Sequence, residues 1–93
     1  MISLHICGLD RNTIDSVIDK WKDTLNEVDC TIKSSGLYRP TLCLTWNYCV
    51  YPPTDEVCDF IRSQFSDTVD VVSVIDAIRH LRNNETLQFR VSK

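Results

Sequence analysis

The segment TLCLTWNYCV, residues 41–50, decides the fold of this chain. Its larger apolar side chains occupy every second position: Leu42, Leu44, Trp46, Tyr48 and Val50. The positions between them carry smaller or polar side chains: Thr41, Cys43, Thr45, Asn47 and Cys49. A period of two is typical of a strand with one buried face. We therefore predict a central strand over this segment, with the Trp46 side facing the core.

Four further segments are predicted as strands. Residues 2–7 and 86–91 alternate between apolar and polar side chains, and residues 29–34 do so over a shorter run. Residues 68–72 are predicted to form a short buried strand.

Three segments have the spacing of helices. The clearest has Asn12 as its predicted N-cap and one apolar stripe: Ile14, Val17, Ile18, Trp21, Leu25 and Val28. Residues 55–65 follow a Thr54 cap, with Asp55 and Glu56 near the positive end of the helix dipole. A short helix over 73–81 is predicted from the Ser73 and Asp76 spacing. The alternative is one long strand over 69–81 that folds back at Asn83-Asn84 onto the last strand.

The order of these elements resembles the β-α-β-β-α-β pattern of ferredoxin-like domains over residues 1–72. We therefore expect a single α+β domain spanning 1–93. It would have an antiparallel sheet with two helices on one face, plus an appended short helix and a C-terminal strand. The resemblance includes no family motif, so it implies a fold and no function.

The formal net charge of −3 argues against a general grip on nucleic acid, which relies on cations that neutralise phosphates. A nucleic-acid-binding module remains an alternative because Trp46, Tyr48 and Tyr51 occur together. The alternation, however, places Trp46 and Tyr48 on the core side of their strand.

The cysteines are odd in number and lack paired C-x-x-C spacing: Cys7, Cys30, Cys43, Cys49 and Cys58. The first residues lack the pattern of a signal peptide, and no apolar run approaches the about 18 residues of a membrane span. We expect a cytoplasmic protein with free thiols and no membrane association.

The sheet face opposite the two helices is predicted to carry small or weakly polar side chains: His5, Cys7, Cys43, Thr45, Asn47 and Cys49. Such a face needs a cover. We expect either the appended helix or a second copy of the chain, which would make a homodimer.

Chemistry-bearing residues are few. His5 and Cys7 point the same way on one strand, and Arg11 follows at the start of a helix, so a small ligand or an anion is one candidate for this region. His5 and Cys7 could also bind a metal, but a structural role is the more frequent one for free cysteines, and we expect that role here. No catalytic residue, metal site or cofactor is predicted.

The connection between the second and third predicted strands contains Leu37, Tyr38 and Arg39, which fit no periodic face. Tyrosine beside arginine has the composition of an interface anchor. We therefore predict a small, non-enzymatic binding or regulatory protein that contacts another protein. Inhibitors of a larger host protein, including those that phages or mobile elements encode, are proteins of this kind.

Overall fold

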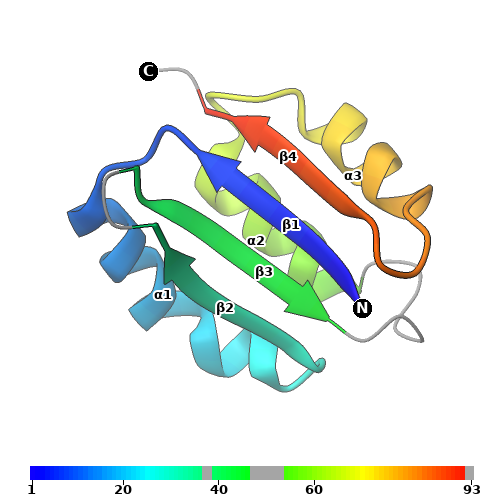
Figure 1. Cartoon of the computed structure of the whole chain (residues 1–93), viewed down its shortest axis with the longest axis horizontal. Coiled ribbons are helices and arrows are strands. Elements are labelled where there is room, and N and C mark those ends of the chain that lie inside the picture. Colours follow the sequence, from blue (N-terminus) through cyan, green and yellow to red (C-terminus); the bar gives the residue numbers. More distant parts are fainter. Residues whose placement is uncertain (37–38, 47–53, 92–93) are drawn as a thin grey trace.

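The computed structural model describes residues 1–36, 39–46 and 54–91 of the chain (Figure 1). It has the α+β class, with a four-stranded mixed sheet and three helices. The elements follow one another as β1 (Ile2–Cys7), α1 (Arg11–Asn26), β2 (Cys30–Ser35), β3 (Thr41–Trp46), α2 (Asp55–Phe65), α3 (Val71–Arg79) and β4 (Thr86–Arg90).

The sheet has the strand order β2-β3-β1-β4. β3 runs antiparallel to both β1 and β2, whereas β4 runs parallel to β1. Leu44 of β3 lies opposite Leu4 on one side and Ile32 on the other. β3 therefore has a neighbouring strand on each side, which confirms the prediction of a central strand over its described residues. The last four positions of the predicted central strand, 47–50, lie outside the described residues.

The predicted strand over 68–72 is wrong. Thr68 and Val69 each donate a backbone N–H to the carbonyl of Phe65, which closes α2 with a turn. Asp70 then caps α3, because its carboxylate accepts hydrogen bonds from both the backbone N–H and the hydroxyl of Ser73. The alternative of one long strand over 69–81 is wrong for the same reason, and the helix begins at Val71 instead of Ser73.

The expectation of a fully antiparallel sheet is also wrong, because two helices in succession precede β4. A single helix after β3 would return the chain so that the next strand runs parallel to β3. Here α2 and α3 cross the molecule twice, so the chain enters β4 at the end of the sheet where β1 begins (Figure 1). β4 therefore lies parallel to β1. The C-terminal strand is thus not an appendage, because it forms one edge of the sheet.

All three helices lie on one side of the sheet, and one core fills the space between them (Figure 1). Trp46 is 3% exposed and belongs to this core, as the alternation predicts. Four aromatic rings pack edge to face through it, with centroids 5.4 to 6.1 Å apart: Trp21, Phe60, Phe65 and Phe89. Ile75 and Ile78 of α3 join the same core. The expectation that the third helix covers the opposite sheet face is therefore wrong.

Helix α1 begins earlier than predicted, and its N-cap is Asp10 instead of Asn12. An oxygen of the Asp10 carboxylate accepts a 2.7 Å hydrogen bond from the backbone N–H of Thr13. Gly8 makes this early start possible, since its φ of +98° turns the chain sharply out of β1. At the other end of the helix Asp29 has a φ of 60°, so β2 begins one residue later than predicted.

Candidate functional site

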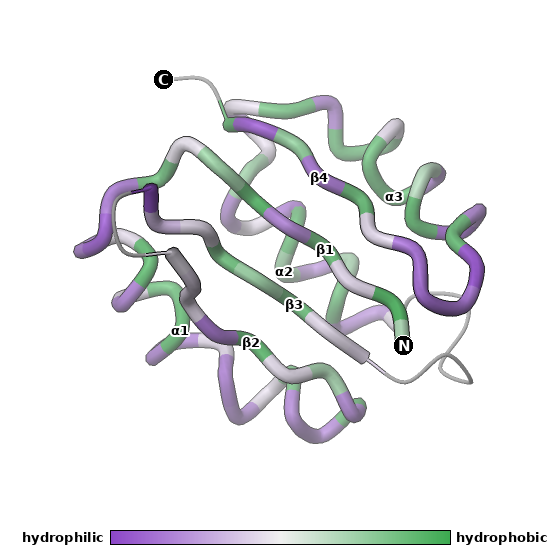
Figure 2. The backbone as a smooth tube through the Cα atoms, in the orientation of Figure 1, coloured by the Kyte–Doolittle hydropathy of each residue, from purple (hydrophilic) through white to green (hydrophobic). Residues whose placement is uncertain are grey.

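The sheet face opposite the helices is not covered by any part of the chain that the structure describes (Figure 1). We refer to it as the open face. The register of the four strands gives its residues in three rows. Along the strands they are Thr31, Lys33 and Ser35 (β2), Thr41, Cys43 and Thr45 (β3), Ser3, His5 and Cys7 (β1), and Thr86, Gln88 and Arg90 (β4). Figure 2 shows the alternation of hydropathy most clearly along β4.

The middle row crosses the whole sheet in the order Lys33, Cys43, His5, Gln88. Cys43 is only 4% exposed, although it lies on the open face. Its sulfur lies 3.4 Å from the hydroxyl oxygen of Ser35. The centre of the open face is therefore a shielded, weakly polar strip, with longer polar side chains on either side of it.

Charge is distributed unevenly between the two sides of the molecule. All thirteen Asp and Glu residues belong to helices or connecting segments, and none belongs to a strand. The open face carries Lys33 and Arg90, and Arg39 stands beside it just before β3. An ion pair joins Arg62 and Asp59 on α2, away from the open face. The open face is therefore basic, although the chain as a whole is acidic.

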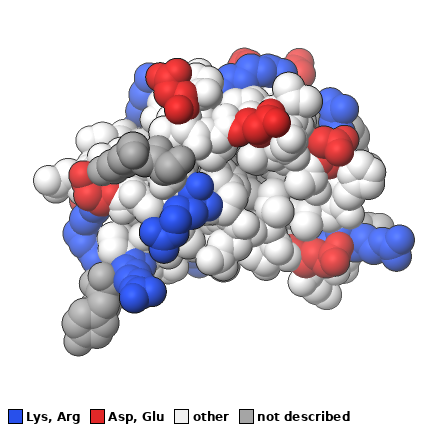
Figure 3. Space-filling model, turned by 90° about the horizontal axis from the view of Figure 1, so that it is seen from above, with Lys and Arg blue, Asp and Glu red and all other residues white. Residues whose placement is uncertain are grey.

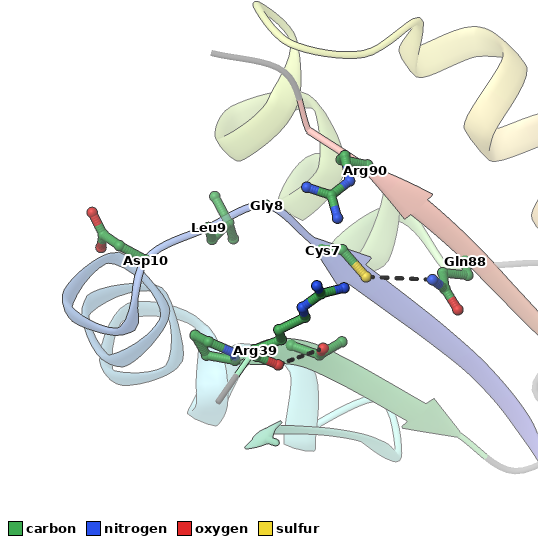
Figure 4. A pocket seen from close by; sticks show the side chains of 9 residues that line it. Cys7, Gly8, Leu9, Asp10, Arg39, Gln88 and Arg90 are labelled. Atoms are coloured by element: carbon green, nitrogen blue, oxygen red, sulfur yellow. Dashed lines mark hydrogen bonds between the residues drawn. The ribbon is translucent and has the colours of Figure 1, made fainter. Parts of the chain in front are cut away.

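One end of the open face contains a hollow of about 740 Å³, at the end of β1 and β4 and the start of β3. The residues that matter for its chemistry are Cys7, Gly8, Arg39, Thr41, Gln88 and Arg90. Figure 4 shows the guanidinium groups of Arg39, which precedes β3, and of Arg90, on β4, extending toward Cys7. Figure 3 looks onto this end of the molecule and shows blue side chains close together there. We call this feature the arginine hollow.

Backbone and side-chain hydrogen bonds connect the residues that line the arginine hollow. The backbone N–H of Val91 donates to the carbonyl of Cys7 at 2.9 Å, which joins the ends of β4 and β1. The side-chain amide of Gln88 donates to the sulfur of Cys7 at 3.5 Å. On the opposite wall, the hydroxyl of Thr41 donates to the carbonyl of Arg39 at 3.3 Å. Arg90 lies on β4 and Arg39 directly precedes β3, and both of these strands pair with β1, so the sheet brings the two arginines to the same end.

The structure brings several of the predicted site residues together. His5, Cys7, Cys43 and Thr45 share the open face, and Arg39 lines the arginine hollow. Arg11 is placed differently from the expectation of a shared pocket with His5 and Cys7, since it donates to the carbonyl of Gly36 at 3.3 Å and does not line the hollow. Leu37, Tyr38 and Asn47 lie outside the described residues.

Sequence reasoning missed Lys33, Gln88 and Arg90 as members of the site. The signal was the alternation within residues 29–34 and 86–91, which puts these three on the polar side of their strands. The place of Gln88 and Arg90 beside His5 and Cys7 depends on the pairing of β4 with β1, which the predicted strand order did not contain.

The thiols differ in their surroundings. Burial raises the pKa of the Cys30 thiol to about 12, and burial is also the main cause that raises the pKa of Cys58. Both belong to the core. Gln88 donates to Cys7, and no hydrogen bond joins His5 to Cys7 within the described residues. In that part of the chain no three His, Cys, Asp or Glu residues form a group that could hold a metal ion.

No family model, curated protein or solved structure matches this chain significantly. None of the helices that the structure describes has the length and apolar character needed to cross a membrane. The open face and the arginine hollow are therefore the features from which function has to be inferred.

Proposed function

We propose that this chain is a small, non-enzymatic binding protein, and that its open face contacts an acidic surface of another protein. The observation that carries the proposal is the separation of charge. Lys33 and Arg90 project from the open face, while the carboxylates lie in helices and connections. Electrostatic complementarity of this kind guides encounter and excludes partners with the wrong charge.

The composition of the open face supports a protein partner over a nucleic acid. Single-stranded nucleic acids are held on sheets by aromatic side chains that stack on the bases. The described residues of the open face include no Phe, Tyr or Trp, and Trp46 points into the core. Threonine, serine and glutamine instead offer hydrogen bonds at several points of the surface, as the polar rim of a protein interface does.

The homodimer predicted from the sequence would use the same open face and stays a prediction. Two copies that meet through this face bring Lys33 and Arg90 of both copies together, and like charges at an interface are unfavourable. This is why we favour a different protein as the partner. A cytoplasmic inhibitor of a larger host protein, encoded by a phage or a mobile element, would act in this way by occupying an acidic surface.

The proposal is tested by affinity capture from the native cell with nuclease-treated extracts. Two variants alter the open face, Lys33→Glu and Thr45→Asp. The matched control is Lys22→Glu on α1, which makes the same charge change at an exposed residue that does not belong to the open face. We expect one protein to be captured by the parent chain and by the control, and to be lost with both open-face variants. Cross-links from Lys33 should end in a peptide that contains Asp or Glu.

Three outcomes contradict the proposal. The first is a partner that open-face variants retain and the Lys22→Glu variant loses. The second is a partner that disappears after nuclease treatment, which indicates nucleic acid. The third is a parent chain whose mass in light scattering is that of a dimer and falls to a monomer with Thr45→Asp, which assigns the open face to a second copy.

A further inference from the structure

The arginine hollow holds two cations, and none of the carboxylates among the described residues forms an ion pair with them. Figure 4 shows both guanidinium groups directed toward Cys7, and neither Arg39 nor Arg90 forms an ion pair within residues 1–36, 39–46 and 54–91. Asp10 is the one acidic residue at the rim. Its carboxylate accepts the backbone N–H of Thr13 as the cap of α1, and Figure 4 shows it turned away from the arginines.

The donors around the hollow suit an oxyanion. Each guanidinium presents a rigid fork of N–H groups that matches the oxygens of a phosphate or a carboxylate. The amide of Gln88 uses one N–H on the sulfur of Cys7, and an amide carries a second one. Gln88 and Arg90 lie on β4, whose end the Val91 to Cys7 hydrogen bond joins to β1. Arg39 directly precedes β3, which also pairs with β1.

The number of positive charges favours phosphate over carboxylate. A carboxylate bears one negative charge and is satisfied by one arginine fork. A phosphate monoester bears about 1.5 to 2 negative charges at pH 7 and offers three terminal oxygens, enough to bridge two forks. The hollow of about 740 Å³ is also larger than a bare phosphate needs and lies within the range of small-molecule sites.

We infer that the arginine hollow is a binding site for the phosphate group of a small phosphomonoester, with Arg39 and Arg90 as the two phosphate ligands and Gln88 as a neutral donor. Arg90 belongs both to the basic open face and to the hollow, whereas Lys33 lies at the far side of the sheet and takes no part in the hollow. The Lys33→Glu variant therefore distinguishes this site from the protein contact proposed above. No bond is made or broken in this role.

The test is a titration of the full chain with inorganic phosphate. Binding is monitored through the amide signals in heteronuclear NMR spectra. Sodium chloride at equal ionic strength and sodium acetate serve as the comparison anions. We expect saturable shifts at Gly8, Thr41 and Arg90 with phosphate. Binding should be stronger at pH 7.5 than at pH 5, because phosphate gains negative charge over this range as its second proton dissociates.

Three substitutions locate the site. Arg39→Gln and Arg90→Gln should each weaken phosphate binding about tenfold, the size expected from a charge-assisted hydrogen bond. The matched control is Arg82→Gln, which removes the same charge from the connection before β4 and should leave binding unchanged. Arg90→Lys keeps the charge without the fork, and we expect an affinity between those of the parent and Arg90→Gln. The dispersion of the amide spectra confirms that each variant is folded.

Several results would overturn the inference. Shifts that rise linearly without saturation, or that chloride reproduces, show general screening alone. Equal affinity for acetate shows a carboxylate site. Unchanged binding in Arg39→Gln and Arg90→Gln shows that phosphate binds elsewhere. Loss of the protein partner with Lys33→Glu, while phosphate binding persists, would instead support the inference, because it shows that the two sites act separately.

Discussion

The carbonyl oxygen of Val91 lies 2.6 Å from the position that a Cβ atom on Gly8 would occupy. Gly8 also has a φ of +98°, a conformation that residues with a side chain rarely adopt. The two residues meet where β1 and β4 end, directly beside the arginine hollow. Close approach of the backbone at this point therefore requires glycine.

The substitution Gly8→Ala is expected to lower the free energy of unfolding by about 1 to 3 kcal/mol, because the added methyl group meets the Val91 carbonyl and the positive φ becomes strained. Urea denaturation followed by circular dichroism measures the change. Ser63→Ala on the exposed side of α2 is the control and should stay within about 0.5 kcal/mol of the parent. Equal stabilities of the two variants would contradict the account of this turn.

Ile78→Ala and Val72→Ala form a matched pair on α3. Ile78 is fully buried in the shared core, whereas Val72 is 78% exposed. We expect Ile78→Ala to cost about 2 to 5 kcal/mol of unfolding free energy, and Val72→Ala to change it by less than about 0.5 kcal/mol. Chemical denaturation of both variants tests whether α3 is an integral part of the domain. A small effect of Ile78→Ala would mean that it is not.

The Asp70 carboxyl makes the stability of the domain depend on pH in the acid range. The hydroxyl of Ser73 and then its backbone N–H lower the pKa of the Asp70 carboxyl below its ordinary value. A lowered pKa in the folded state adds stability above the ordinary aspartate pKa of about 3.9, and this stability is lost as the pH falls through the folded pKa.

The substitution Asp70→Asn keeps an oxygen that can cap α3 and removes only the charge. We expect the parent chain to be more stable than this variant at pH 7. The difference should shrink as the pH falls below about 4, where the carboxylate becomes protonated. Urea midpoints of both proteins across this range measure the effect. A difference that does not change with pH would contradict the role of the carboxylate charge.

The Cys30 thiol makes the stability of the domain fall as the pH rises in the alkaline range. Burial raises the pKa of its thiol to about 12, whereas an unfolded thiol ionises at about 8.5. The contribution of Cys30 is complete below the unfolded pKa and is lost as the pH rises toward the folded one. Above pH 8.5 we expect the parent chain to lose up to about 1.4 kcal/mol per pH unit relative to Cys30→Ala.

Urea titrations of the parent chain and Cys30→Ala between about pH 7 and pH 10 check this prediction, because the other ionising groups are common to both proteins. Alkylation followed by peptide mass spectrometry gives an independent check. In the folded chain the half-buried Cys7 should be labelled well before Cys30. Rapid labelling of Cys30 would show that its side chain is not in the core.

The residues with strong periodicity were predictable from the sequence. The alternation in 2–7, 42–46 and 86–91 marks the strands and their buried sides, and the stripes in α1 and α2 mark the helices. The error at 68–72 has a local cause. A run of β-branched residues favours a strand, but the carboxylate of Asp70 together with Ser73 caps a helix at the same place.

The candidate site was predictable only in part, since it depends on the direction of the last strand. His5, Cys7, Cys43 and Thr45 follow from the alternation alone. Arg90 comes to lie next to Cys7 only because β4 is parallel to β1, and that direction follows from the second crossing of the molecule by α3. Because residues 68–72 were wrongly assigned to a strand, the place of Arg90, one of the two arginines of the hollow, could not be predicted.

The parallel pairing of β1 and β4 also determines how the domain resists mechanical load. Tension applied at residues 1 and 91 pulls these neighbouring strands past each other along their length. All hydrogen bonds of the ladder between Ser3–Cys7 and Thr86–Arg90 then carry the force at once, in shear. In an antiparallel pair the same tension would break the hydrogen bonds of the ladder one after another, starting at one end. The short helix α3 thus turns a mechanically weak arrangement of the chain into a strong one.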